Sequence, residues 1–160
     1  MLDLWKFIKN NFRVKDSGTM TETNCSVTVM PAKEDPWRIG FIERQEEDDY
    51  HKDLVAPGGK IEMDDGEEIE GVPYFSVEHC AERELKEETG LTVDRNQMEY
   101  FCSLTLPNGR VVISLYALVD EDKNSEKIIW LTEEEIKEEE GFAPGMKTEA
   151  LLLLEDLRSP

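Results

Sequence analysis

The spacing of apolar residues along the chain predicts most of its strands. Five stretches are apolar, alternating or β-branched, and we expect each to form a strand: 25–30, 37–44, 98–106, 110–119 and 128–131. Asn108-Gly109, between the third and fourth stretches, is a strong β-hairpin signal. The acidic segment 64–74 has neither strand nor helix periodicity, so we expect a loop there.

Three further segments have the periodicity of helices. We expect one helix from Ser76 to Thr89, a short one that begins at Thr132, and a last one over 144–157. Ser76 and Thr132 suit the N-cap position, because a hydroxyl oxygen can accept a hydrogen bond from a free N–H of the first turn. Gly90 suits the left-handed position that ends a helix.

Strands and helices interleave with no internal repeat and no linker, which predicts a single mixed α/β (α+β) domain over residues 1–160. Residues 1–20 are an extension, and apolar residues recur at roughly helical spacing over 1–12, so a short amphipathic helix is expected there. A hydrophobic content of 39%, with three Trp, four Tyr and six Phe, is typical of a folded core.

The net charge of −19 restricts the partners of the chain, because such a field repels polyanions. We therefore expect no nucleic-acid partner. No signal peptide or membrane span is recognisable, and the three widely spaced cysteines fit reduced thiols, so we expect a cytoplasmic protein without a membrane partner. A homodimer is compatible with the sequence.

Carboxylates occupy the apolar face of the expected helix 76–89. At about 3.6 residues per turn, one face is formed by Val77, Cys80, Ala81 and Leu85. Glu84 and Glu88 fall in the middle of this face and Glu87 lies at its edge. Ionised carboxylates directed at a core are costly unless they are compensated. Clustered oxygen ligands are usually compensated by Mg²⁺ or Mn²⁺, so the pattern predicts one wall of a metal site.

Residues 83–91, Arg-Glu-Leu-Lys-Glu-Glu-Thr-Gly-Leu, resemble the second half of the Nudix box, the signature GX5EX7REUXEEXGU of the Nudix (MutT-like) hydrolases, where U is aliphatic. Residues 56–62, Ala-Pro-Gly-Gly-Lys-Ile-Glu, resemble the glycine-rich segment that precedes the box helix. The signature places the arginine 14 residues after the glycine, whereas Arg83 follows Gly59 by 24 residues. The ten extra residues lie within 63–75. Glu67 fits the first box glutamate by its Gly-Glu context, but counting back from Arg83 gives Phe75.

The resemblance implies an α/β/α sandwich with a mixed β-sheet, Mg²⁺ or Mn²⁺ as cofactor, and hydrolysis of a nucleoside diphosphate linked to a group X. The implied metal ligands are the Gly59 carbonyl and the side chains of Glu67, Glu84, Glu87 and Glu88. Arg83 is expected to orient the site by binding Glu87 or another box carboxylate. The general base is either a box glutamate, Glu84 or Glu87, or a glutamate of a later loop, for which Glu126 is a candidate ahead of Glu121.

Substrate recognition is less restricted by the sequence. Basic, aromatic and soft side chains that could contact a nucleotide are Arg44, Lys60, Phe142 and Met146. The leading hypothesis is a small-molecule substrate, a nucleoside triphosphate (a dNTP or an oxidised dNTP), cleaved to NMP and pyrophosphate. ADP-ribose or another NDP-sugar, and a non-catalytic nucleotide-sensing domain, are the alternatives. RNA cap removal is disfavoured because the chain has no basic stripe.

Overall fold

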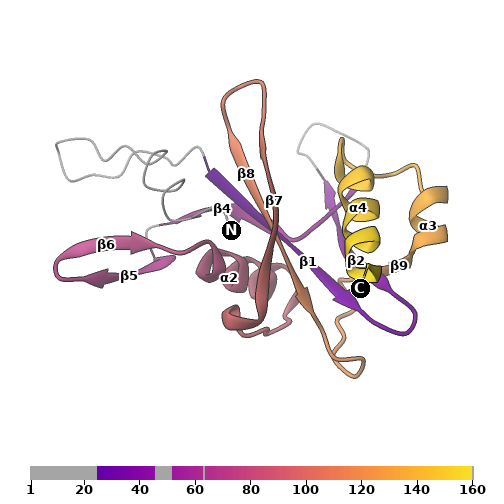
Figure 1. Cartoon of the computed structure of the whole chain (residues 1–160), viewed down its shortest axis with the longest axis horizontal. Helices are drawn as coiled ribbons and strands as arrows, with labels where there is room; N and C mark the ends of the chain where they lie inside the picture. Colours follow the sequence, from indigo (N-terminus) through magenta and orange to yellow (C-terminus); the bar gives the residue numbers. More distant parts are fainter. Residues whose placement is uncertain (1–24, 46–51, 63, 160) are drawn as a thin grey trace.

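The computed structural model describes residues 25–45, 52–62 and 64–159, and a seven-stranded sheet forms its centre (Figure 1). The central strand, β1 (Cys25–Lys33), pairs in parallel with β8 (Val111–Leu118) along one side. On its other side β1 pairs antiparallel with β2 (Arg38–Gln45) and with the short β4 (Gly58–Lys60). Parallel and antiparallel pairs therefore occur together, and the prediction of an α+β fold with a mixed sheet is confirmed.

Three strands complete the sheet. Two pair with β2 and one with β8, and these are β3 (Lys52–Val55), β9 (Ile129–Thr132) and β7 (Met98–Thr105). A single turn of 3₁₀-helix, η1 (Arg95–Gln97), leads into β7. The Pro-Asn-Gly turn between β7 and β8 lies where the sequence predicts a hairpin.

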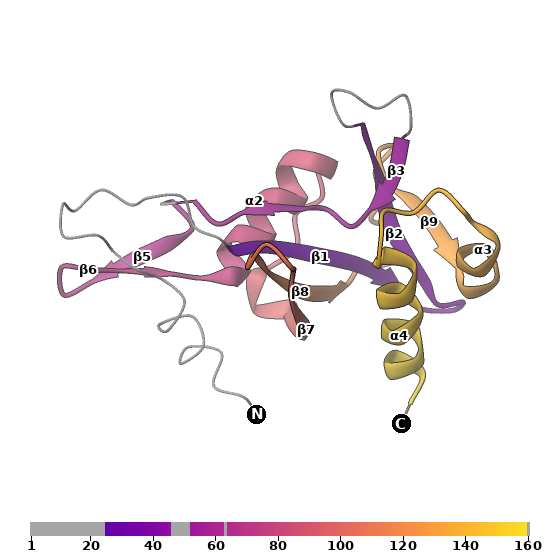
Figure 2. The ribbon, with the colours of Figure 1, turned by 90° about the horizontal axis from the view of Figure 1, so that it is seen from above.

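Two hydrophobic cores lie on opposite faces of the sheet. The helices that cover them are α2 (Val77–Thr89) on one face, and α3 (Glu133–Glu138) and α4 (Met146–Arg158) on the other. Val27 and Val29 of β1 contribute to the α2 core, whereas Met30 contributes to the α4 core, as the alternation of side chains along a strand requires. Figure 2 shows α2 and α4 toward opposite ends of β1.

The helix boundaries follow the predicted signals. Ser76 Oγ accepts from His79 N, and Gly90 ends α2 with φ of 80°. Thr132 and Glu135 form the capping box of α3. The helix expected within residues 1–20 lies outside the described residues. No helix in the described ranges is both long and apolar enough to cross a membrane.

The prediction of a loop at 64–74 is wrong, because most of this segment forms a β-hairpin apart from the main sheet. Its strands are β5 (Gly66–Ile69) and β6 (Val72–Phe75), and the hairpin projects from the start of α2, away from α4 (Figure 1). The turn residues Glu70 and Gly71 both have positive φ, 52° and 77°, as in a tight two-residue hairpin turn. β5 is largely exposed beyond Gly66, so no alternation of apolar and polar residues marks it in the sequence.

Candidate functional site

A buried aspartate binds the arginine of the box. Arg83 Nε donates to Asp65 Oδ1 at 2.7 Å and Arg83 Nη2 donates to Oδ2 at 2.8 Å, a bidentate ion pair. Asp65 is 1% exposed, and its Oδ2 also accepts from Glu62 N at 2.7 Å. Burial alone would raise the pKa of Asp65, but the hydrogen bonds from Arg83 and Glu62 N, together with the Arg83 charge, hold this pKa below its ordinary value. Asp65 is therefore a fixed, ionised anchor for Arg83.

The position of Asp65 explains the expanded spacing of the box. Asp65 is the sixth residue after Gly59, where the signature has its first glutamate, and the seven residues that the signature places before the arginine are 76–82. Residues 66–75, the β5–β6 hairpin, are therefore the whole insertion. Ser76 N donates to Asp65 O at 2.8 Å, so the two ends of the hairpin meet. The insertion thus leaves the carboxylate of Asp65 within reach of Arg83.

Glu67 lies on this hairpin and is not brought to the carboxylates of α2. Its side chain is 65% exposed, and Glu67 Oε1 is 4.0 Å from Nε2 of His79. His79 is only partly exposed. We therefore place Asp65, and not Glu67, at the first acidic position of the box.

Glu84 points from α2 toward the backbone of β4. It is 8% exposed, and its Oε1 accepts from Arg83 Nη1 at 2.8 Å. A Cβ atom at Gly59 would lie 2.2 Å from Glu84 Oε1, closer than any real contact. Only glycine lets the β4 backbone approach this carboxylate so closely. Steric constraint therefore explains why the box has glycine at position 59.

Glu88 lies one turn further along the same face and carries an unsatisfied oxygen. Glu88 Oε1 accepts from Arg44 Nη2 at 3.1 Å, whereas Oε2 is shielded from solvent and has no hydrogen-bond partner in the described part of the chain. Burial, and then the charge of Glu84, raise the pKa of Glu88, against the opposing effect of the Arg44 charge. A cation would stabilise both carboxylates, so these residues fit a hard divalent ion such as Mg²⁺ or Mn²⁺.

Glu87 has a different environment from its neighbours. Its side chain is 60% exposed, and Oε2 lies 3.2 Å from Arg83 Nη1, as expected for residues one turn apart. Among residues 25–45, 52–62 and 64–159, no three His, Cys, Asp or Glu side chains are grouped closely enough to hold a metal ion. The structure thus brings together Glu84, Glu88 and the backbone of Gly59, and leaves Glu87 at the rim.

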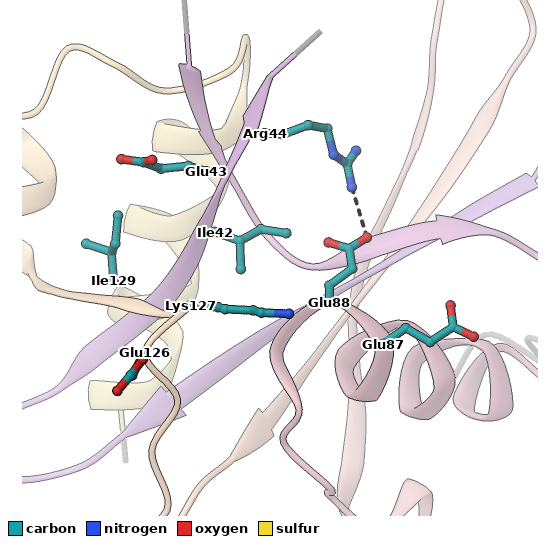
Figure 3. Close-up of a pocket in the computed structure, with 8 residues that line it drawn as sticks. All are labelled: Ile42, Glu43, Arg44, Glu87, Glu88, Glu126, Lys127 and Ile129. Carbon is teal, nitrogen blue, oxygen red and sulfur yellow. Dashed lines mark hydrogen bonds and ion pairs between the residues drawn. The ribbon is translucent and has the colours of Figure 1, made fainter. Parts of the chain in front are cut away.

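A cavity of about 640 Å³ opens beside Glu88 (Figure 3). The cavity is lined by β2, by the last turn of α2, and by the loop before β9 together with the first residue of β9. The lining residues are Ile42, Glu43, Arg44, Glu87, Glu88, Glu126, Lys127 and Ile129. Glu126 therefore lines the same cavity as the α2 glutamates, although its carboxylate is turned away from Glu88 in Figure 3. Lys127 points toward Glu88 from the same loop. No motif in the sequence singled out Lys127.

Three of the four side chains expected to contact substrate do not line this cavity. Phe142 packs edge-on against Phe41, with ring centroids 5.0 Å apart, and Met146 is 8% exposed, with its sulfur 3.2 Å from Ala56 N. Both belong to the α4 core. Lys60 is exposed on β4, outside the residues that line the cavity. Only Arg44 lies where a substrate at the α2 carboxylates would meet it.

No family model and no curated protein matches the chain. Solved structures do match. The NUDIX domain of Shewanella oneidensis NrtR, complexed with ADP ribose, aligns with a TM-score of 0.60 and 16% identity over 99% of this chain and 97% of that one. The chain has a Nudix fold. A MutT structure, from work on the Aliivibrio salmonicida and Vibrio cholerae proteins, aligns with a TM-score of 0.56 and 18% identity over 81% of this chain and 93% of that one.

A third Nudix structure, a MutT/nudix family protein from Enterococcus faecalis, aligns with a TM-score of 0.52 and 18% identity over 81% of this chain. This chain spans 50% of that protein's length. Identities of this size establish the Nudix fold, and the chemistry has to be argued from the site itself. In the Nudix fold of this chain, α2 is the box helix, Gly59 precedes it on β4, and Asp65 takes the first acidic position.

Proposed function

We propose that this chain is a metal-dependent Nudix hydrolase that cleaves a nucleoside diphosphate linked to a group X. The observation that carries the proposal is a pair of carboxylates on α2. Glu84 is buried against the backbone of Gly59, and Glu88, one turn further on, has an Oε2 atom that lacks a partner among the described residues. A cavity of about 640 Å³ adjoins Glu88. Carboxylates withdrawn from solvent in this way destabilise the fold unless they serve a ligand, and oxygen ligands suit Mg²⁺ or Mn²⁺.

The residues of the box have two proposed roles, metal binding and orientation of the metal ligands. Glu84, Glu88 and the Gly59 carbonyl would hold the metal ion, and Glu87 would add a ligand from the rim. When bound, the ion neutralises phosphate charge and activates a water molecule. Arg83, fixed by Asp65, orients Glu84 through a hydrogen bond of 2.8 Å. Arg44 holds Glu88 from the opposite wall of the cavity.

Glu126 is the proposed general base, the group that accepts the proton of the attacking water. The two carboxylates of α2 that line the cavity are already engaged, because Glu87 lies 3.2 Å from Arg83 and Glu88 lies 3.1 Å from Arg44. Glu126 is exposed and forms no ion pair within the described part of the chain, so rotation of its side chain can bring it into the cavity.

The first substrate to test is a nucleoside triphosphate, cleaved to NMP and pyrophosphate. ADP-ribose is the second candidate, because the NUDIX domain of NrtR, which aligns over 99% of this chain, is complexed with ADP ribose. The products distinguish the two, since ADP-ribose gives AMP and ribose 5-phosphate.

A screen of nucleoside triphosphates, oxidised dNTPs and NDP-sugars with 5 to 10 mM Mg²⁺, roughly the saturating range for a weak oxygen site, tests the proposal when products are identified by chromatography. We expect phosphate products that depend on Mg²⁺ and that Glu88→Gln abolishes. Folded protein that turns over none of these compounds would refute the proposed reaction. Nucleotide binding without products would instead assign a non-catalytic nucleotide sensor.

A further inference from the structure

Two cations line the cavity, and Lys127 is the one whose charge is not engaged by a carboxylate of the described residues. Arg44 Nη2 already donates to Glu88 Oε1 and to Gly58 O, both at 3.1 Å. Lys127 forms no ion pair in the described ranges, and its side chain extends toward Glu88 (Figure 3). An ammonium group beside the α2 carboxylates is free to bind an anion that those carboxylates would otherwise repel.

Ser125 ties the loop that carries Lys127 to the end of the box helix. Ser125 Oγ donates to Thr89 O at 2.5 Å, a carbonyl of the last turn of α2 that has no partner within the helix. Ser125 Oγ also accepts a hydrogen bond from Lys127 N at 3.2 Å. One hydroxyl group therefore connects the backbone of Lys127 to the helix that carries Glu84 and Glu88.

Two further contacts hold this loop. Ile128 N donates to Ser125 O at 3.1 Å, and the Ile128 side chain is buried in the α2 core. Asn124 Oδ1 accepts from Nε1 of Trp130, a residue near the start of β9, at 2.9 Å. The backbone on both sides of Lys127 is thus fixed, so the lysine is held at a set place relative to the α2 carboxylates while its side chain stays free to bind.

We propose that Lys127 binds a phosphate group of the substrate and that Ser125 is the positioning residue that places it there. The inference rests on the proposed function and specifies how a chain of net charge −19 holds a diphosphate. A lysine is suited to this because it acts as a mobile point charge toward phosphate oxygens. Lys60, which the sequence suggests as a nucleotide contact, does not line this cavity.

Binding of inorganic pyrophosphate with Mg²⁺, measured by titration calorimetry on the whole chain, tests the role of Lys127. Lys127→Met should weaken binding about tenfold, the loss of one charged hydrogen bond at an exposed site. Lys123→Met is the matched control, because Lys123 lies earlier in the same loop, is exposed as Lys127 is, and does not line the cavity. In turnover assays Lys127→Met should raise KM for the nucleotide more than it lowers kcat.

Ser125 is tested in the same assay by a double-mutant cycle. Ser125→Ala should weaken pyrophosphate binding about threefold, the size of one neutral hydrogen bond, and Ser125→Thr should restore it. In the Lys127→Met background, Ser125→Ala should have no further effect, whereas a purely structural role for Ser125 would leave its effect unchanged.

The outcomes separate this inference from the proposed function. Wild-type protein that neither binds pyrophosphate nor cleaves any nucleotide would overturn both. Wild-type protein that does both, with Lys127→Met indistinguishable from Lys123→Met, would overturn the role of Lys127 alone. An effect of Ser125→Ala that persists without the lysine would overturn the positioning role of Ser125.

Discussion

The Asp65–Arg83 ion pair predicts a large loss of stability when the aspartate is neutralised. Asp65→Asn keeps the size of the side chain but leaves Arg83 without its bidentate partner. Removal of one member of a buried ion pair costs about 3–5 kcal/mol. The Arg83 side chain is 20% exposed and keeps contacts with Glu84 and Glu87, so we expect a loss at or just below the lower end of this range, about 2–3 kcal/mol of unfolding free energy.

Urea unfolding at pH 7, followed by tryptophan fluorescence, measures this loss as a shift of the midpoint at unchanged slope. Glu87→Gln is the matched control, because it removes a carboxylate 3.2 Å from the same arginine but 60% exposed. Exposed ion pairs contribute at most about 1 kcal/mol, so the control should lose clearly less than Asp65→Asn. Equal losses in the two variants would refute the assignment of Asp65 as the buried anchor.

The effect of Asp65→Asn should also depend on pH in a defined direction. The folded-state pKa of Asp65 lies below the ordinary value of 3.8. The stabilisation is therefore fully present above that value and disappears as the pH falls through the folded-state pKa. The difference between wild type and Asp65→Asn should be the same at pH 7 and pH 5 and should shrink below about pH 4. A difference that grows on acidification would contradict the buried, ionised pair.

Three other changes test the remaining parts of the site. Deletion of residues 66–75 joins Asp65 to Ser76 and restores the spacing of the box. It should lower the free energy of unfolding by no more than about 2 kcal/mol, for the lost packing of Phe75, and should preserve Mg²⁺-dependent turnover. A deletion variant that folds but is inactive would show that the hairpin is part of the site. Gly59→Ala should lower turnover about 10²-fold, because the added Cβ displaces the Glu84 carboxylate. Gly141→Ala is the control and should not lower turnover, because its Cβ meets only the flexible Glu139 side chain. Equal rates for the two variants would contradict the close approach of Gly59 to Glu84. Mg²⁺ at 100 times its Kd should stabilise wild type by about 2.7 kcal/mol in thermal unfolding and should not stabilise Glu88→Gln. The raised pKa of Glu88 means that ionisation of this carboxyl group opposes folding as the pH rises. Without metal, the Tm of Glu88→Gln should therefore be no lower than that of wild type at pH 7. A clearly lower Tm would contradict the unsatisfied carboxylate.

Most of the fold could be predicted because its signals are local. Strand periodicity, the Asn108-Gly109 turn and the caps at Ser76, Gly90 and Thr132 each depend on a few neighbouring residues. The β5–β6 hairpin has no such signal, since Glu70-Gly71 is an uncommon pair for its turn and the strands bury little apolar surface.

The same distinction between local and tertiary signals applies to the residues of the site. Helical periodicity alone places Glu84 and Glu88 on the buried face of α2, and the structure confirms that Glu84 is buried. Asp65 could have been found by counting forward from Gly59, but the insertion directs attention to Glu67. Lys127 could not have been found, because its place depends on a hydrogen bond between Ser125 and Thr89, 36 residues apart, and such tertiary contacts leave no mark in a single sequence.

The hydrogen bond from Ser76 N to Asp65 O makes the base of the hairpin a closed junction in the chain. Sequence added beyond this junction needs no new loop closure, and the cost of lengthening a loop grows only slowly with its length. The tip at Glu70-Gly71 is exposed, which makes it a suitable point for grafting a peptide tag or a reporter domain, or for opening the chain in a circular permutant. The β5–β6 hairpin would hold such a graft outside the cavity. A probe attached there could report on the protein without altering the residues of the box.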